Sequence, residues 1–382
     1  MEFQLSEEQR AIQTMAADFA AERMAPFAAD WDRDHTFPEE TLREAAALGF
    51  AMMFVAEANG GAGLSRLDAA IVFEELARAC PSTAAYISIH NMVAGMIERF
   101  GSDALRAAHL PALATMERFA AYCLTEPGAG SDAASLKTKA RREGEDYIID
   151  GAKAFISGGG RADLYVVMAR TGGDGAGGVS AILVEAGTPG LSFGAQEEKL
   201  GWHSQPTAAV MFDGCRVPVS HRLGEEGEGF KIAMTGLDGG RLNIAACSLG
   251  AGAAALDQAA RYAKERRQFG KALEEFQATQ FKLADMATHM EAARLLLHKA
   301  ARAVDERNPD ATALAAMAKR LATDTGFEVV NTALQIHGGY GYLRDYPLER
   351  LLRDLRVHQI LEGTNEIMRV IISRHLLRAS NQ

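Results

Sequence analysis

The sequence predicts an α+β protein of three parts: an N-terminal helical domain over residues 1–119, a middle β-barrel or β-sandwich domain over 120–227, and a C-terminal four-helix bundle over 228–382. Helical periodicity gives way to short β-branched and aromatic runs near Ala121, and it returns after Gly229. Length agrees with this division, because 382 residues exceed what one hydrophobic core usually supports.

The first part carries helix signals at intervals. Ser6 and Gln9 have the spacing of a capping box, which opens a helix. Pro38 with the two glutamates after it can begin another helix. The run 67–78 places apolar residues on one side at helical spacing, and Pro81 interrupts it. A set of packed helices is therefore expected here.

Short strand-like runs separated by glycine-rich turns make up the middle part. These runs are YIID from Tyr147, LYVVMA from Leu164, SAILVE from Ser180 and AAVMFD from Ala208. The glycine-rich stretch 171–178 is interpreted as a flexible hairpin loop, not as a ligand-binding loop. The spacing of the runs predicts a small β domain.

Long helical segments fill the last part. They are expected near 230–265, 275–306, 310–336 and 346–378, and helices of this length usually pack as a bundle. The second segment carries an apolar stripe that recurs every three or four residues, which packing alone explains. The stripe consists of Leu283, Met286, Met290, Ala293 and Leu297.

Charge and cysteine content exclude several classes of function. The formal net charge of -10 disfavours nucleic acid and anionic membranes as partners, because phosphate binding relies on clustered Lys and Arg. No segment has the ~18 apolar residues of a membrane span. The four cysteines, Cys80, Cys123, Cys215 and Cys247, lie far apart, so neither a metal site nor a disulfide framework is expected. A reducing compartment fits, either the bacterial cytoplasm or the mitochondrial matrix after removal of a transit peptide.

One motif suggests a dinucleotide site. Residues 128–133 match the loose form of the Rossmann fingerprint, and Asp150 closes a strand about twenty residues later. That motif needs a helix to open at the glycines and alternating βα units to follow. Pro127 precedes it here and further short strands follow, so NAD binding is not expected.

Six motifs occur in a fixed order over most of the chain. They are YCLTEPGAGS at 122–131, FIS at 155–157, LDGGR at 237–241, RRQFG at 266–270, QIHGGYG at 335–341 and LEGTNE at 361–366. Together they resemble the motifs of the flavin-dependent acyl-CoA dehydrogenases. The resemblance implies that family's order of domains, helical then β then helical, and FAD as the cofactor.

The resemblance also implies which residues contact FAD. Hydroxyls of Thr125 and Ser131 can bond the edge of a flavin ring, and glycines let the backbone approach it. Phe155 stands where many relatives carry tryptophan, and Ser157 where threonine is common. The implied set is Tyr122, Leu124, Thr125, Gly130, Ser131, Phe155, Ile156, Ser157, Arg266, Gln268, Phe269, Phe276, Gln277, Gln335, Ile336, Gly338, Gly339, Thr364 and Glu366.

Part of this set is expected to serve a neighbouring subunit. In the family the glycine run 338–341 and the arginine at Arg266 reach a flavin held by the next subunit. The resemblance therefore implies at least a dimer, and usually a homotetramer built as a dimer of dimers. The residues alone leave other interpretations open. A glycine run after a helix can be a C-cap, and Arg266 can be a solvated charge.

Glu362 is the candidate catalytic base. Apolar Ile360 and Leu361 precede it, and burial raises a carboxylate's pKa toward neutrality. The resemblance implies that Glu362 takes the α-proton of an acyl thioester while the β-hydrogen leaves as hydride to the flavin. Its backbone N–H and a ribityl hydroxyl would stabilise the thioester oxygen. Some branches of the family place the base just before the arginine of the LDGGR motif, which is Gly240 here.

The resemblance implies substrate contacts and partners as well. The expected substrate contacts are Ser131, Asp238, Arg241, Gly363 and Arg374. A surface ion pair explains Arg374 nearly as well, and Ser88–Met92 could line the acyl pocket or form a core helix face.

Several segments resemble the branch that acts on short branched acyl chains. Isobutyryl-CoA is therefore the expected substrate, and butyryl-CoA and 2-methylbutyryl-CoA are alternatives, because a methylene is worth only ~1–3 kcal/mol. Electron-transferring flavoprotein is the expected acceptor. An acyl-CoA oxidase and a non-catalytic flavin-containing member of the family remain alternatives.

Overall fold

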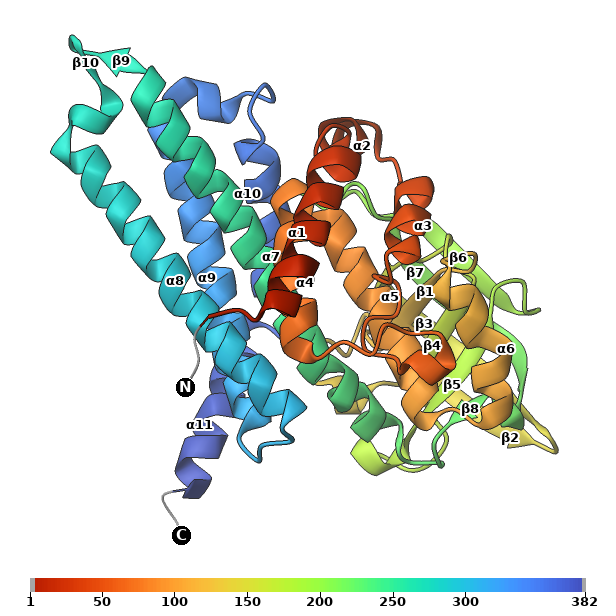
Figure 1. The fold of residues 1–382 in the computed structure, drawn as a ribbon. Helices are drawn as coiled ribbons and strands as arrows, with labels where there is room; N and C mark the ends of the chain where they lie inside the picture. Colours follow the sequence, from red (N-terminus) through yellow and green to blue (C-terminus); the bar gives the residue numbers. More distant parts are fainter. Residues whose placement is uncertain (1–3, 380–382) are drawn as a thin grey trace.

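The computed structural model describes residues 4–379, and within that range helices alone precede the first strand of the sheet (Figure 1). Ser6 Oγ accepts from Gln9 N–H while Gln9 Oε1 accepts from Ser6 N–H, so the capping box is confirmed. The helices are α1 (Glu7–Phe19), a π-helical turn (Ala20–Met24), α2 (Ala28–Asp34), α3 (Glu39–Ala47), a 3-10 turn (Glu57–Asn59), α4 (Arg66–Ala79), α5 (Pro81–Phe100) and α6 (Asp103–Ala114).

The middle part forms one sheet with the strand order β6-β7-β3-β2-β4-β5-β8, and β1 lies parallel to β4. All four predicted strand runs are confirmed, and 171–178 joins the antiparallel pair β4 and β5 as the predicted loop. The strands are β1 (Ala120–Cys123), β2 (Lys139–Glu143), β3 (Asp146–Ser157), β4 (Leu164–Arg170), β5 (Val179–Glu185), β6 (Leu191–Gln196), β7 (Thr207–Pro218) and β8 (Arg222–Leu223).

The glycines of the dinucleotide-like motif do not open an α-helix. The chain after β1 makes a turn in which Glu126 and Ala129 exchange two backbone hydrogen bonds, of 3.1 and 3.2 Å. Only a three-residue 3-10 turn, Ala133–Ser135, follows. The strand–turn–helix geometry that a pyrophosphate needs in a Rossmann fold is therefore not formed at this motif.

The last part is helical, with one correction to the prediction. The segment 346–378 is not one helix, because it breaks at 357–364, and Glu362 lies in the break. A short hairpin, 267–272, joins the first two long helices. The elements are α7 (Gly229–Glu265), β9 (Arg267–Gln268), β10 (Lys271–Ala272), α8 (Gln277–Asp305), α9 (Ala311–His337), α10 (Leu348–Arg356) and α11 (Asn365–Ala379).

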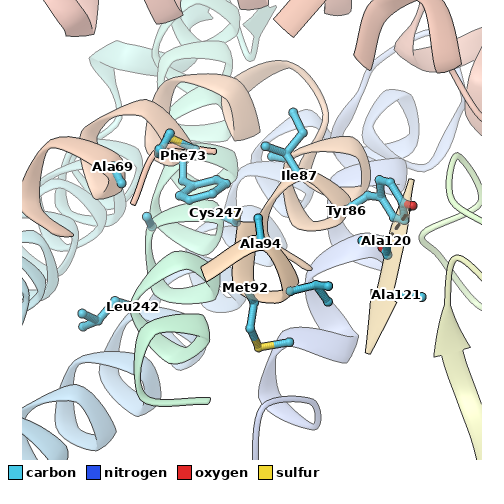
Figure 2. Close-up of a cluster of buried hydrophobic side chains, with 14 of the residues drawn as sticks. Ala69, Phe73, Tyr86, Ile87, Met92, Ala94, Ala120, Ala121, Leu242 and Cys247 are labelled. Atoms are coloured by element: carbon cyan, nitrogen blue, oxygen red, sulfur yellow. Dashed lines mark hydrogen bonds between the residues drawn. The ribbon is translucent and has the colours of Figure 1, made fainter. Parts of the chain in front are cut away.

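Helix α7 is the centre of the molecule, since it packs against α4, α5, α8 and α9. Figure 2 shows side chains of α4, α5 and α7 meeting beside β1, where the Tyr86 hydroxyl donates to the Ala120 carbonyl at 3.3 Å. The predicted stripe of α8 also faces this bundle, with Leu283 partly buried and the other four members buried. None of the helices within residues 4–379 is long and apolar enough to cross a membrane.

Helices α4 and α7 approach each other closely at Gly250. A Cβ added there would lie 2.0 Å from the Glu74 carbonyl oxygen and 3.0 Å from the Ala77 Cβ. Backbone cannot yield as a flexible side chain can, so only glycine allows the helices to cross at this distance.

Gly250→Ala is expected to lower the free energy of unfolding by about 1–3 kcal/mol, because the methyl group forces α4 away from α7. Chemical denaturation measures the change. Gly95→Ala in α5 is the control, since nothing lies within 4 Å of a Cβ there. That control should be neutral or stabilising by up to about 1 kcal/mol. Equal stability of the two variants would contradict the close crossing.

Candidate active site

The break between α10 and α11 presents Glu362 in an unusual backbone conformation. Its φ is +57°, and that of Gly363 is +90°, so two successive residues are left-handed. A non-glycine residue pays roughly 1–2 kcal/mol for this conformation. Such strain persists only where the surrounding structure fixes it, and it often marks a functional position.

The carboxylate of Glu362 lies against the bare backbone of Gly240 in α7. A Cβ built at Gly240 would be 2.7 Å from Oε2 and 2.8 Å from Cδ and Oε1. Oε2 is buried and has no hydrogen-bond partner in the structure. Burial raises the pKa of Glu362 to about 7, although the charges of Arg241 and Lys319 oppose the rise. This carboxylate is therefore placed and tuned to exchange a proton near neutral pH.

Two buried cations hold the loop. Arg241 Nε donates to the Glu362 carbonyl at 3.2 Å, and Arg241 Nη1 pairs with Asp238 at 2.5 Å. Lys319 Nζ donates to the Gly363 carbonyl at 2.9 Å. The structure thus brings the expected substrate residues Asp238, Arg241 and Gly363 together, and it gives Arg241 a support role as well. Their contact with substrate stays a prediction.

The start of α11 is capped by Thr364, whose hydroxyl accepts from the Ile367 N–H at 3.3 Å. Asn365 instead turns its side chain into the protein. Glu366 is exposed and pairs with Arg369 at 3.3 Å. Arg374 is exposed further along α11, and no hydrogen bond or ion pair within residues 4–379 joins its side chain to another expected site residue.

The expected flavin residues of the β domain gather at the ends of β1 and β3. The Ala154 N–H donates to the Thr125 carbonyl at 2.9 Å, so the two motifs lie side by side. Residues 154 and 155 oppose the single residue 209 of β7, which makes a β-bulge. In this bulge Phe155 has a φ of +58° and its ring is 68% exposed. The Phe155 ring therefore faces outward from a strained backbone position. Its neighbours in the strand, Ile156 and Ser157, are buried and half-buried.

Several features of this region fit a bound ligand. The Tyr122 hydroxyl is buried and has no hydrogen-bond partner among residues 4–379. Burial, together with the nearby charge of Glu362, holds its pKa well above the usual range. Gly130 has nothing within 4 Å of a Cβ, so packing in this chain does not require glycine there. Leu124 is buried, whereas Gly130 and Ser131 lie on an exposed turn. A flat polar cofactor could bond the unpaired Tyr122 hydroxyl, lie against the turn at Gly130 and Ser131, and stack on the exposed ring of Phe155.

A buried ion pair, which no sequence pattern indicated, supports this turn. Lys153 Nζ donates to Glu126 Oε1 at 2.8 Å and to the Leu124 carbonyl at 3.1 Å. The Glu126 carboxylate also accepts from the N–H groups of Lys137 and Thr138, at 2.6 and 2.9 Å. One carboxylate therefore ties both ends of the turn to β3.

A second set of hydrogen bonds supports the loop that carries Glu362. The Trp202 indole N–H donates to His358 Nε2 at 3.2 Å. Because Nε2 accepts, the proton of the neutral imidazole lies on Nδ1, which donates to the Ser248 hydroxyl at 2.8 Å. Burial lowers the pKa of His358 to about 3, which keeps the ring neutral. Trp202, Ile244 and Ala85 form a small apolar cluster, against which Leu361 packs.

The other expected flavin residues lie at the opposite end of the helical bundle. Helix α9 rises about 27 Å from Lys319, beside the base loop, to His337. The β9–β10 hairpin projects at that far end (Figure 1). Phe269 is 95% exposed there with a φ of +52°, and the Arg266 guanidinium lies 5.4 Å from the Tyr340 ring centre. The remaining members of this group are Gln268, Phe276, Gln277, Gln335, Ile336, Gly338 and Gly339.

One chain therefore holds two separate groups of expected flavin contacts. Gly338 has a φ of +59°, and neither Gly338 nor Gly339 has any atom within 4 Å of a Cβ. These glycines follow α9 directly, so they also end the helix. Within one chain, the structure does not bring this group to Glu362 or Phe155.

Comparison with known proteins gives a consistent result. Three family models match the chain in succession: "Acyl-CoA dehydrogenase, N-terminal domain" over residues 6–117, "middle domain" over 121–215 and "C-terminal domain" over 227–377. A mitochondrial isobutyryl-CoA dehydrogenase of Bos taurus is 58% identical over 98% of this chain and 90% of its own.

Two solved structures are similar throughout. Butyryl-CoA dehydrogenase from Megasphaera elsdenii is 40% identical, with a TM-score of 0.95 over 99% of this chain and 100% of its own. A structure described as PigA with FAD and proline is 33% identical, with a TM-score of 0.96 over 98% of this chain and 99% of its own.

Lys153→Met is expected to cost about 3–5 kcal/mol of unfolding free energy, because it leaves the Glu126 carboxylate buried without its cation. Chemical denaturation tests this. Lys139→Met is the matched control, since Lys139 is an exposed lysine on the neighbouring strand β2. It should change stability by no more than ~0.5 kcal/mol. Similar values for both variants would show that the buried pair does not stabilise the turn.

Proposed function

The chain belongs to the acyl-CoA dehydrogenase family, and from this we propose that it dehydrogenates isobutyryl-CoA at the α and β carbons to give methacrylyl-CoA. One observation carries the proposal. Glu362 Oε2 is buried without a hydrogen-bond partner among residues 4–379, the carboxylate faces a position without a side chain, and burial raises its pKa to about 7. The identity to an isobutyryl-CoA dehydrogenase supports the substrate.

Glu362 acts as the base that removes the α-proton. Its raised pKa brings it closer to the acidity of a carbon next to a thioester than an exposed carboxylate would be. The N–H of Glu362 donates to no acceptor within residues 4–379. That N–H is therefore free to bond the thioester oxygen and to stabilise the negative charge that grows there as the proton leaves.

We propose FAD as the cofactor, on the support of the family and of a similar structure that carries FAD. When bound, FAD would accept the hydrogen that leaves the β-carbon with its electron pair. Tyr122, Thr125 and Ser157 would offer it polar groups, and Phe155 an aromatic face. The chain's own task is then to hold the α–β bond between this face and Glu362.

We further propose that the hairpin end of the bundle serves the site of a neighbouring copy in a homotetramer. The β9–β10 hairpin, which follows Arg266 and carries Phe269 at its turn, projects from the end of the bundle opposite the base loop (Figure 1), so these residues lie away from the site of their own chain. Exposure of an aromatic ring at a strained backbone position supports a partner there. We propose electron-transferring flavoprotein as the acceptor, since the relatives named above include two dehydrogenases.

Anaerobic titration of the purified flavoprotein tests the substrate. Isobutyryl-CoA should bleach the flavin absorbance faster than butyryl-CoA or 2-methylbutyryl-CoA, by about 10- to 200-fold if one methyl group fills the pocket.

Glu362→Gln should stay yellow with all three acyl-CoA substrates, because the amide cannot take the α-proton. Rapid bleaching of that variant would reject the base. Peroxide released with each enoyl product under air would identify an oxidase instead.

The reduction rate at low substrate concentration should rise with pH through about 7, because only ionised Glu362 accepts a proton. Below that pH the rate should fall about tenfold per unit. Stopped-flow reduction from about pH 5.5 to about pH 8.5 measures this. Glu328→Gln, an exposed carboxylate on α9, is the control and should keep the wild-type profile. A rate that stays flat over this range would contradict the assigned role of Glu362.

A further inference from the structure

Lys319 is a buried ammonium group without an ion-pair partner in the part of the chain that the structure describes. Its side chain is 0% exposed, and no carboxylate of the described residues lies within ion-pair distance. An isolated buried charge costs several kcal/mol, and a lysine usually avoids that cost by pairing or by reaching solvent. Lys319 does neither. A structural need for packing alone would be met by methionine or leucine, so the charge itself calls for an explanation.

Both acceptors of this ammonium belong to the loop that carries the base. Lys319 Nζ donates to the Gly363 carbonyl and to Asn365 Oδ1, each at 2.9 Å. Gly363 directly follows Glu362, and Asn365 begins α11. Arg241 Nε donates to the carbonyl of Glu362. The carbonyls of both left-handed residues, Glu362 and Gly363, therefore each accept a hydrogen bond from a buried cation.

The same ammonium is linked to the other side of the break. Asn365 Nδ2 donates to Thr323 Oγ1 at 3.0 Å and to Asp324 Oδ1 at 2.8 Å. Gln359 Nε2 donates to that same Asp324 oxygen at 2.9 Å. Helix α9 therefore binds the loop before and after Glu362, and Lys319 is the link nearest to the base.

We propose that Lys319 is a positioning residue for the reaction proposed above, holding Gly363 and Asn365 so that the Glu362 carboxylate stays against Gly240. The role rests on the proposed function of Glu362 but not on the identity of the acyl group. Without the ammonium, the Gly363 carbonyl and the Asn365 side chain lose their shared donor. The left-handed pair is then free to relax toward ordinary backbone conformations.

The positive charge of Lys319 has an effect on the pKa of Glu362 that an apolar side chain packed in its place would not have. Lys319 stabilises the ionised form of Glu362, as Arg241 does, so its removal raises the pKa of the base further above its usual value. Burial lowers the pKa of Lys319 to about 8, while the negative charge of Glu362 opposes that change. The charged or titratable groups that face the loop from the elements around it are Tyr122 of β1, Asp238 and Arg241 of α7, Lys319 and Asp324 of α9, His358 of the turn 357–359, and Glu366 of α11.

The test compares Lys319→Met, Lys319→Gln and the control Lys299→Met, an exposed lysine on α8. Hydrogen exchange by mass spectrometry follows peptides that cover 357–368, and stopped-flow reduction follows the pH profile of the flavin-loaded protein. Lys319→Met should raise exchange in this peptide several-fold and shift the half-maximal pH upward by ~1 unit. Lys319→Gln keeps a donor without charge, so it should shift the profile while exchange stays near the wild type.

Two outcomes would overturn the proposal. One is wild-type exchange and a wild-type pH profile in Lys319→Met. The other is a rate loss by the same factor at every pH with unchanged exchange. If Lys319→Met does not fold, the pH profile of flavin reduction in Lys319→Gln decides, and a profile that matches the wild type would overturn the proposal. If no acyl-CoA reduces the wild-type protein, the proposed function fails, and the exchange comparison still decides whether Lys319 holds the loop.

Discussion

The site depends on a break in what would otherwise be one C-terminal helix. In a continuous helix the carboxylate of Glu362 would point along the helix surface, and its N–H would bond a carbonyl four residues earlier. Two left-handed residues turn that side chain toward α7 and release that N–H. The conformation costs free energy, and hydrogen bonds from Arg241 and Lys319 to successive carbonyls offset the cost. The proposed base, the free N–H donor and the supporting cations thus arise from one local distortion.

All three parts of the chain fix the helix that leads into this break. Arg353 of α10 binds both oxygens of Asp32 in α2, at 3.0 and 2.6 Å. The next residue, Asp354, accepts from the backbone N–H of Trp202 at 2.6 Å, in the loop before β7. His358 then connects to Ser248 of α7. The loop is therefore positioned by the packing of the domains on one another, and a single domain would not define it.

Much of this architecture follows from local pattern. Alternating helical and strand-like texture predicted the three parts, and the six motifs predicted the family and the base. Lys319 was missed because a lysine within a long helix carries no distinguishing signal in sequence. Glu126 and Lys153 were missed for a similar reason, since their pairing depends on the path of β3 beside the turn. The break at 357–364 lies within a segment predicted as helical, because apolar residues recur at helical spacing on both sides of it.

The contact between Glu362 and Gly240 also has an evolutionary consequence. The two positions share one space, since even a methyl group at 240 would come within 2.7 Å of Oε2 and push the Glu362 carboxylate aside. A side chain gained at position 240 therefore changes where the Glu362 carboxylate lies, even if residue 362 itself is unchanged. Substitutions at the two positions are in this sense coupled, and their combined effect should differ from the sum of the single effects. Evolution therefore acts on residues 240 and 362 as a pair.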